Sequence, residues 1–270
     1  EPSVADEFLS VLTLLDGLMG DDRLVAGHDA AFRYARLIAR EAREQRFADE
    51  IREPKVSEDF NQEPRNEGHL VAEVDIRNFN RILESGKTYS TGEQPGEYAR
   101  HERYITREVH KVREDQLTNW EHFDDSHLYK RMVSPDQISE QVQDLCNWLN
   151  SRADRTEEWG GLIATVAHAW LTYIHPFSDG NGRTARLLAN LVLAHGTWPP
   201  LVIKSSTDRP RYIDALDLSD STSAIFPLYE LFWEVLNRKL NDLLVTPEFA
   251  PAQLQFHLTQ DRAKSFNSWL

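Results

Sequence analysis

The 270-residue chain has one cysteine, no long hydrophobic run and no excess of positive charge, and each absence excludes a class of protein. With Cys146 alone, no disulfide can form within the chain, so we expect a reducing compartment and predict a cytoplasmic location. No segment suits a secretory leader or a membrane span, although a start at Glu1 rather than Met leaves a longer native N-terminus open. The formal net charge of −14 disfavours nucleic acid and membranes as partners, because both select for excess Lys and Arg.

The most informative stretch is the polar loop HPFSDGNGRTAR, which runs from His175 to Arg186. It lies between two apolar segments, 160–174 and 184–195, whose length and spacing predict buried helices. Packing a core does not require an imidazole, a carboxylate, two glycines, an asparagine and two arginines in one loop. The stretch therefore predicts a functional site between two helices of an all-α fold.

The loop has the features of a site for polyphosphate. Gly180 and Gly182 allow backbone conformations in which successive N–H groups converge on an anion. The predicted helix starting near Arg183 adds free N–H groups and a favourable dipole. Arg183 and Arg186 are three residues apart, so we expect them to share a helix face and to hold different phosphates.

Three further side chains of the loop suggest chemistry. Asp179 offers hard oxygen ligands for Mg²⁺, although it could also cap the following helix. His175 can accept a proton near neutral pH and is the candidate general base. Asn181 suits a structural role in a turn, and its amide could also donate to a phosphate oxygen.

The loop resembles the signature of the Fic family, His-x-Phe-x-(Asp/Glu)-Gly-Asn-Gly-Arg-x-x-Arg, at every specified position. A chance match of eight fixed positions is on the order of one in a hundred million for such a chain. The resemblance implies an all-helical Fic core and transfer of AMP from ATP, with Mg²⁺, to a Ser, Thr or Tyr hydroxyl of a target protein. It also implies that Arg186 holds the γ-phosphate.

Outside the loop, the resemblance implies three further features with weaker support. Tyr212 is at the position of a tyrosine that walls the adenine pocket, although an ordinary core tyrosine is the alternative. Glu67 precedes a glycine as in the family's inhibitory helix, but Glu63 replaces the Ser or Thr expected four residues earlier. Residues 115–134 are at the place of the family's β-hairpin flap, for which an exposed hairpin without this role is the alternative.

The chain is predicted to have three parts: an N-terminal helical extension over 1–60, a Fic domain over 61–245, and a C-terminal helical tail over 246–270. Within the second part, the pattern predicts a helix over 97–113. Ser134, followed by proline and by glutamine three residues on, predicts a capped helix start.

Alternative functions remain open at this point. The same loop could remove AMP by hydrolysis, or transfer phosphoryl or phosphocholine groups. The family's phosphotransferring branch has Lys in place of the second glycine, so Gly182 disfavours that branch. A nucleotide-sensing regulator is a non-enzymatic alternative, which the intact loop disfavours. The expected partners are ATP and a target protein, with a homodimer as an option.

Overall fold

The computed structural model describes residues 20–51, 69–106, 129–204, 206–222 and 224–245, and these residues are predominantly helical. The helices are α2 (Gly20–Ile51), α3 (Glu73–Leu83), α4 (Ile138–Asn150), α5 (Thr156–Ile174), α6 (Asn181–His195), α7 (Arg209–Thr222) and α8 (Phe226–Val245). Two single-turn 3₁₀ helices, Pro135–Gln137 and Ala153–Arg155, precede α4 and α5. The predicted all-α class is confirmed.

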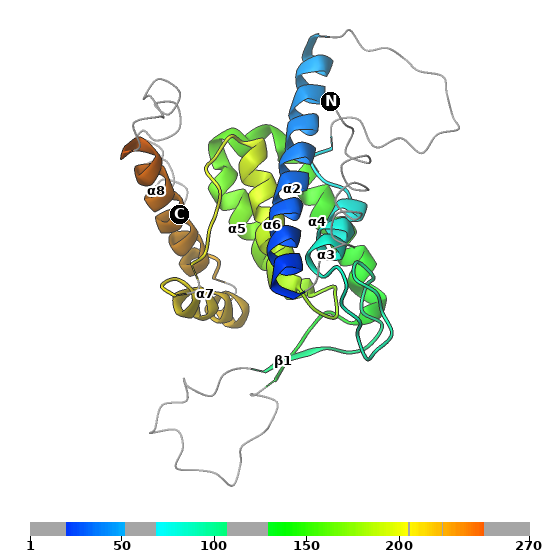
Figure 1. Ribbon diagram of the computed structural model, residues 1–270. Helices are drawn as coiled ribbons and strands as arrows, with labels where there is room; N and C mark the ends of the chain where they lie inside the picture. Colours follow the sequence, from blue (N-terminus) through cyan, green and yellow to red (C-terminus); the bar gives the residue numbers. More distant parts are fainter. Residues whose placement is uncertain (1–19, 52–68, 107–128, 205, 223, 246–270) are drawn as a thin grey trace, which may run out of the picture.

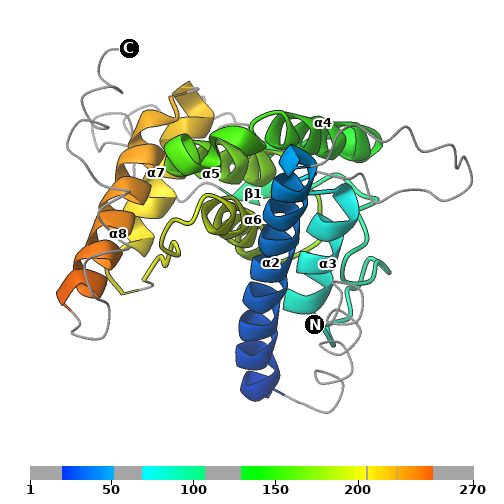
Figure 2. The ribbon, with the colours of Figure 1, turned by 90° about the horizontal axis from the view of Figure 1, so that it is seen from above.

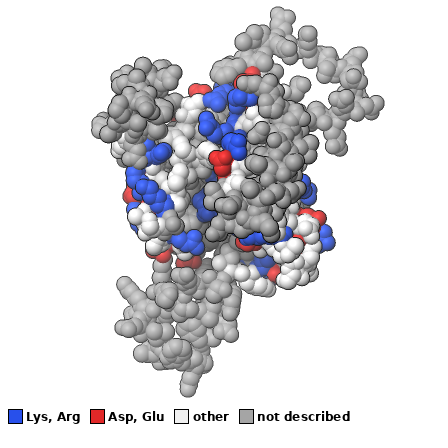
Figure 3. All heavy atoms as spheres, viewed as in Figure 1, with Lys and Arg blue, Asp and Glu red and all other residues white. Residues whose placement is uncertain are grey.

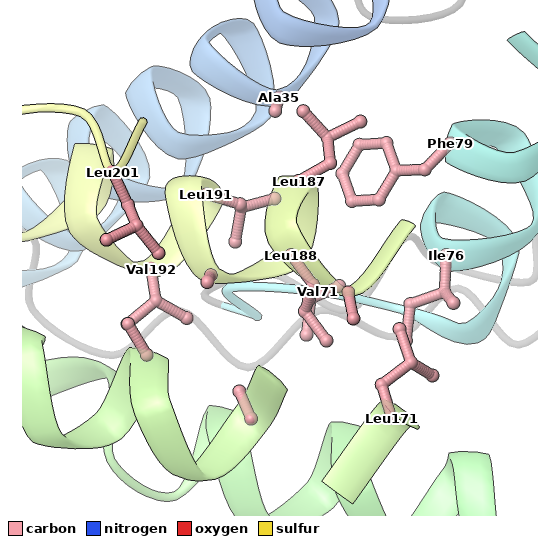
Figure 4. Packing of buried hydrophobic residues seen from close by; sticks show 14 of the residues in the cluster. Ala35, Val71, Ile76, Phe79, Leu171, Leu187, Leu188, Leu191, Val192 and Leu201 are labelled. Atoms are coloured by element: carbon pink, nitrogen blue, oxygen red, sulfur yellow. The ribbon is translucent and has the colours of Figure 1, made fainter. Parts of the chain in front are cut away.

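Helix α6 is the centre of the fold, with α2 and α3 on one side and α5 on another (Figures 1 and 2). Eleven of its fifteen residues are buried, which explains why its sequence is apolar on nearly every face. In Figure 4, Leu187 lies beside Phe79 of α3 and near Ala35 of α2, whereas Val192 points toward α5. A helix packed on all sides provides a rigid base for the loop at its N-terminus.

The same hydrophobic core includes residues on both sides of the predicted boundary near residue 60. Tyr34 of α2 is fully buried, and its ring meets that of Phe79 edge to face with centroids 5.8 Å apart. The Tyr34 hydroxyl accepts a hydrogen bond from Asn78 Nδ2 at 3.1 Å. The described part of the N-terminal extension thus packs as an integral layer against the helices that support the loop.

The only strands among the described residues are β1 (Tyr104–Thr106) and β2 (Tyr129–Arg131), which pair antiparallel with Tyr104 opposite Arg131. The predicted helix over 97–113 is wrong for residues 97–106. Tyr-Ile-Thr is a strand-forming triplet, and Gly96, with φ of +83°, redirects the chain ahead of it. The pair projects from the helices (Figure 1), and β2 lies inside the segment expected to carry the flap.

The predicted cap at Ser134 is also wrong in detail. Its hydroxyl contacts the carboxylate of Asp136 rather than a backbone N–H, and a 3₁₀ turn precedes α4. An acidic side chain in the first turn competes for the serine hydroxyl, so the expected reciprocal cap does not form.

Charge is unevenly distributed despite the negative total. On the face in Figure 3, Lys and Arg side chains gather over α2, which carries arginines at helical spacing: Arg33, Arg36, Arg40 and Arg43. Two of them pair with acidic neighbours one turn away, and those acids are largely exposed. No helix among the described residues has the length and apolar character required to span a membrane.

Candidate active site

The predicted loop joins the C-terminal end of α5 to the N-terminal end of α6, so its residues are held between the two most extensively packed helices. His175 ends α5 in the left-handed conformation, with φ of 54° and ψ of 55°. This conformation is rare for a residue with a side chain and costs about 1–3 kcal/mol, so surrounding contacts must impose it. Pro176 follows directly and cannot continue a helix.

His175 is half-buried, and its Nδ1 lies 3.4 Å from the carbonyl oxygen of Thr172. An N–H at Nδ1 would point at this carbonyl, which favours the tautomer in which Nε2 carries no proton. That tautomer is the one required of a general base. The contact thus orients the predicted base.

Gly180 is the residue whose conformation the loop depends on most. Its φ is +78°, and a Cβ there would collide with the Glu84 carboxylate and lie 2.9 Å from Asn80 Nδ2. Gly182, the other glycine of the predicted anion-binding loop, does not have a positive φ. That residue is in the first turn of α6, where a Cβ would have only Arg186 Nη1 near it, at 3.5 Å.

The N-terminal turn of α6 carries the expected free donors. The first backbone hydrogen bond of the helix runs from Thr184 N–H to the Gly180 carbonyl at 2.9 Å. The N–H groups of residues 181–183 therefore have no acceptor one turn earlier in the helix, as is general for helix starts. Donors in this arrangement favour anionic oxygen atoms.

Asn181 is buried and closes the loop on itself. Its Oδ1 accepts the N–H of Phe177 at 2.9 Å, and its Nδ2 donates to the Phe177 carbonyl at 2.7 Å. Phe177 is 1% exposed and anchors the loop in the core, as expected. The geometry accounts for the structural role of Asn181, and a phosphate contact from its side chain stays a prediction.

The spacing of the two arginines predicted a shared helix face, but their side chains point toward different helices. Arg183 Nη2 lies 2.5 Å from Glu84 Oε1, at the C-terminal end of α3. Arg186 is directed toward α7, where its Nη1 donates to the Tyr212 hydroxyl at 3.3 Å and its guanidinium lies 5.7 Å from the ring centroid. The first two turns of α6 thus present one cation toward α3 and one toward α7.

Tyr212 is 4% exposed, and its hydroxyl also lies 2.9 Å from Nε2 of His168. Burial, with a smaller contribution from Arg186, lowers the pKa of His168 to about 3, so the imidazole is neutral at physiological pH. Burial also raises the pKa of Tyr212, so its hydroxyl keeps its proton. The hydroxyl can thus donate to His168 while it accepts from Arg186, and it connects a buried neutral imidazole to the arginine predicted to bind the γ-phosphate.

Two residues of the site were missed by sequence reasoning: Glu84 and Lys87, at the end of α3 and in the turn after it. Lys87 Nζ lies 2.6 Å from Glu84 Oε2 and 2.8 Å from Asp179 Oδ2. With the contact between Glu84 and Arg183, these residues form an alternating acid and base network. Neither residue belongs to a recognisable motif, so only the packing of α3 against α6 reveals them.

The acids of this network are in different environments. Glu84 is fully buried, and burial raises the pKa of its carboxyl although Lys87 and Arg183 oppose the shift. Burial acts in the same direction on Asp179, but hydrogen bonds from Lys87 and from the Gly180 N–H, the latter 2.6 Å long, lower the pKa of that carboxyl below its ordinary value. Asp179 is therefore ionised at neutral pH and has a half-exposed side chain.

A Mg²⁺ ion fits the donors at this site when phosphate supplies the remaining ligands. In the ranges that the structure describes, no cluster of three His, Cys, Asp or Glu side chains could hold a metal by itself. Mg²⁺ bound with nucleotides takes one or two protein carboxylates and otherwise phosphate oxygens and water. Asp179, an ionised carboxylate beside the free N–H groups of α6, suits that role.

Glu67, the predicted inhibitory residue, lies outside the described residues, as do Glu63 and residues 115–128 of the expected flap. The inhibitory role therefore stays a prediction.

Comparison with known proteins identifies the class of domain to which this site belongs. Residues 70–193 match the Fic/DOC family. The match starts just ahead of α3 and ends within α6, so it includes the loop and the residues that hold it. This segment of the chain is therefore similar to a Fic domain.

Individual relatives agree with this class. The protein adenylyltransferase fic-1 of Caenorhabditis elegans is 40% identical over 88 residues, which cover 33% of this chain and 17% of that protein. The protein adenylyltransferase Fic of Drosophila grimshawi is 31% identical over 149 residues, which cover 50% of this chain and 30% of that protein. The chain thus spans less than a third of the length of these relatives.

The fold has a counterpart among solved structures. A Fic-domain-containing signaling protein from Bacteroides thetaiotaomicron superposes with a TM-score of 0.58 at 22% identity, covering 85% of this chain and 76% of that one. At this identity the likeness supports the helical fold alone.

Proposed function

We propose that the chain is a protein adenylyltransferase that transfers AMP from ATP to a Ser, Thr or Tyr hydroxyl of a target protein. The observation that carries the proposal is the placement of His175 at one end of a loop whose other end is the free N-terminus of α6, with Arg183 in the first turn of that helix and Arg186 in the second. A candidate base and a polyphosphate site thus share one short rigid segment. The names of the adenylyltransferase relatives support the same reaction.

In this mechanism, the first-turn N–H groups of α6 and Arg183 bind phosphate oxygens of ATP, and Arg186 holds the γ-phosphate. His175 accepts the proton of the target hydroxyl at Nε2 as the hydroxyl oxygen attacks the α-phosphorus. The bond between the α-phosphorus and the oxygen that bridges it to the β-phosphate breaks, and pyrophosphate leaves. Preorganised donors at the helix terminus stabilise the charge that develops on the phosphates.

Asp179 would hold Mg²⁺ together with phosphate oxygens. When bound, the metal supplies neutralisation of the charge that accumulates on the leaving pyrophosphate. We infer a cytoplasmic location from the single, buried cysteine. A homodimer and an inhibitory Glu67 remain predictions.

The test is incubation with α-labelled ATP and Mg²⁺, followed by intact-mass analysis of the chain and of candidate target proteins. We expect a mass increase of one AMP in the wild type and its loss in His175→Ala. His69→Ala is the matched control, because His69 is an exposed imidazole outside the loop.

Near wild-type labelling by His175→Ala would overturn the base assignment. Release of AMP from a pre-modified target, without forward labelling, would assign hydrolytic removal instead. Nucleotide binding with neither reaction would favour the regulator.

A further inference from the structure

The ammonium group of Lys87 lies beside Asp179, where Mg²⁺ is expected to bind. Its ammonium nitrogen is 2.8 Å from Asp179 Oδ2, and the other carboxylate oxygen, Oδ1, accepts the Gly180 N–H at 2.6 Å. Both oxygens of the candidate metal ligand are therefore engaged by this chain's own donors. A metal ion that binds Asp179 at Oδ2 would lie close to the positive charge of the Lys87 ammonium.

Lys87 has a second acidic partner besides Asp179. Glu84 Oε2 lies 2.6 Å from the same ammonium group, and the Glu84 side chain is fully buried at the end of α3. Lys87 is 42% exposed by contrast, so solvent leaves room for it to move. A shift of the ammonium away from Asp179 would leave it paired with Glu84, whose other carboxylate oxygen contacts Arg183.

An ammonium group and Mg²⁺ compete for the same carboxylate oxygen, since both are cations that seek its lone pairs and they repel each other at close range. We propose that Lys87 is a tethered competitor of the divalent cation, which occupies Asp179 in the nucleotide-free protein and withdraws to Glu84 when metal-bound nucleotide arrives. The inference rests on the proposed function, because it takes Asp179 as the metal ligand for ATP. Its consequence is that Mg²⁺ raises the affinity for nucleotide less than it would if Lys87 did not contact Asp179.

Calorimetric titration tests the competition without relying on transfer. The dissociation constant of α,β-methylene-ATP is measured over a series of Mg²⁺ concentrations for the wild type, for Lys87→Met and for Lys204→Met. Lys204 is an exposed lysine between α6 and α7, so its variant controls for the change in net charge. The Mg²⁺ affinity of the free nucleotide is the same in every titration, so a difference between variants reports on the protein.

We expect the half-saturating Mg²⁺ concentration to fall about threefold in Lys87→Met, the effect of removing a partly exposed ion pair, and to stay unchanged in Lys204→Met. Lys87→Gln should behave as Lys87→Met does, and it provides a second neutral variant should the first fold poorly. An unchanged or higher half-saturating concentration in a folded neutral variant would overturn the competition but leave the proposed function intact. Absence of nucleotide binding by the wild type, with or without Mg²⁺, would overturn both.

Discussion

Arg183 and Arg186 lie one turn apart on the same helix, yet the structure holds them in opposite ways. Arg183 is neutralised by Glu84, a fully buried carboxylate, within a network that includes Lys87 and Asp179. Arg186 has a neutral partner, the hydroxyl of Tyr212. We call Arg183 and its network the charged side of the site, and Arg186 with Tyr212 the neutral side.

The partners on both sides fix the position of an arginine, but only those on the charged side cancel its charge. On the charged side, the carboxylates fix the cation but cancel much of its field, so binding there depends on rearrangement. On the neutral side, the hydroxyl orients the guanidinium and leaves its full charge available to a phosphate. An incoming polyphosphate should therefore meet the stronger attraction at Arg186, and the charged side should govern the metal.

The largest effect should come from Gly180→Ala, which disrupts the charged side at its base. The new Cβ requires a left-handed backbone and collides with Glu84, so we expect a loss of about 3 kcal/mol in the free energy of unfolding. Gly182→Ala is the matched control and should be neutral or slightly stabilising, because that residue is helical and has space for a methyl group. Urea denaturation of both variants measures the difference, and equal losses would contradict the collision.

Glu84→Gln should have the next largest effect, since it removes the charge that balances Arg183 and Lys87. We expect a loss of about 2 to 3 kcal/mol, typical of a broken buried hydrogen bond to a charged group. The control is Glu97→Gln, which breaks an exposed pair with Arg100 and should cost less than about 1 kcal/mol. Thermal unfolding followed by circular dichroism compares them, and similar melting temperatures would show that Glu84 does not anchor Arg183.

The contrast between the sides also shows how far the sequence could be interpreted. The loop, its flanking helices and its place at a helix N-terminus follow from apolar spacing, glycine and charge, and the structure agrees with them. Glu84 and Lys87 carry no such signal, because their roles arise only when the end of α3 packs against Gly180. Tyr212 was identified from position, but its bond to His168 depends on the approach of α7 to α5.

A smaller effect should appear in the pH dependence of stability, through two buried imidazoles. Burial lowers the pKa of His168 to about 3 and that of His195, which is bonded to Thr156, to about 4. A histidine in the unfolded chain has a pKa of about 6.5, so near and below that pH the unfolded state binds more protons than the folded state. The stabilisation is thus fully present above about pH 7 and decreases as the pH falls.

Between about pH 7 and about pH 5.5, each imidazole should contribute a loss of about 1 kcal/mol in the free energy of unfolding. Urea denaturation at several pH values measures the sum, and His195→Gln should show a shallower dependence than the wild type. Proton resonances of the two rings in the folded protein should not titrate above about pH 5. A ring that titrates near its ordinary pKa would contradict its assigned burial.

The smallest effect should come from Tyr212→Phe, which removes one hydroxyl from the neutral side and leaves the Arg186 charge in place. His168 Nε2 and Arg186 each lose a hydrogen-bond partner, so we expect a destabilisation of about 1 kcal/mol. Nucleotide affinity, measured calorimetrically without metal, should fall about threefold because Arg186 is less well oriented. Tyr104→Phe is the control, since that tyrosine is 58% exposed on β1. A loss in Tyr212→Phe as large as that in Glu84→Gln would contradict the distinction between the sides, because it would show that a neutral hydroxyl fixes its arginine as firmly as a buried carboxylate does.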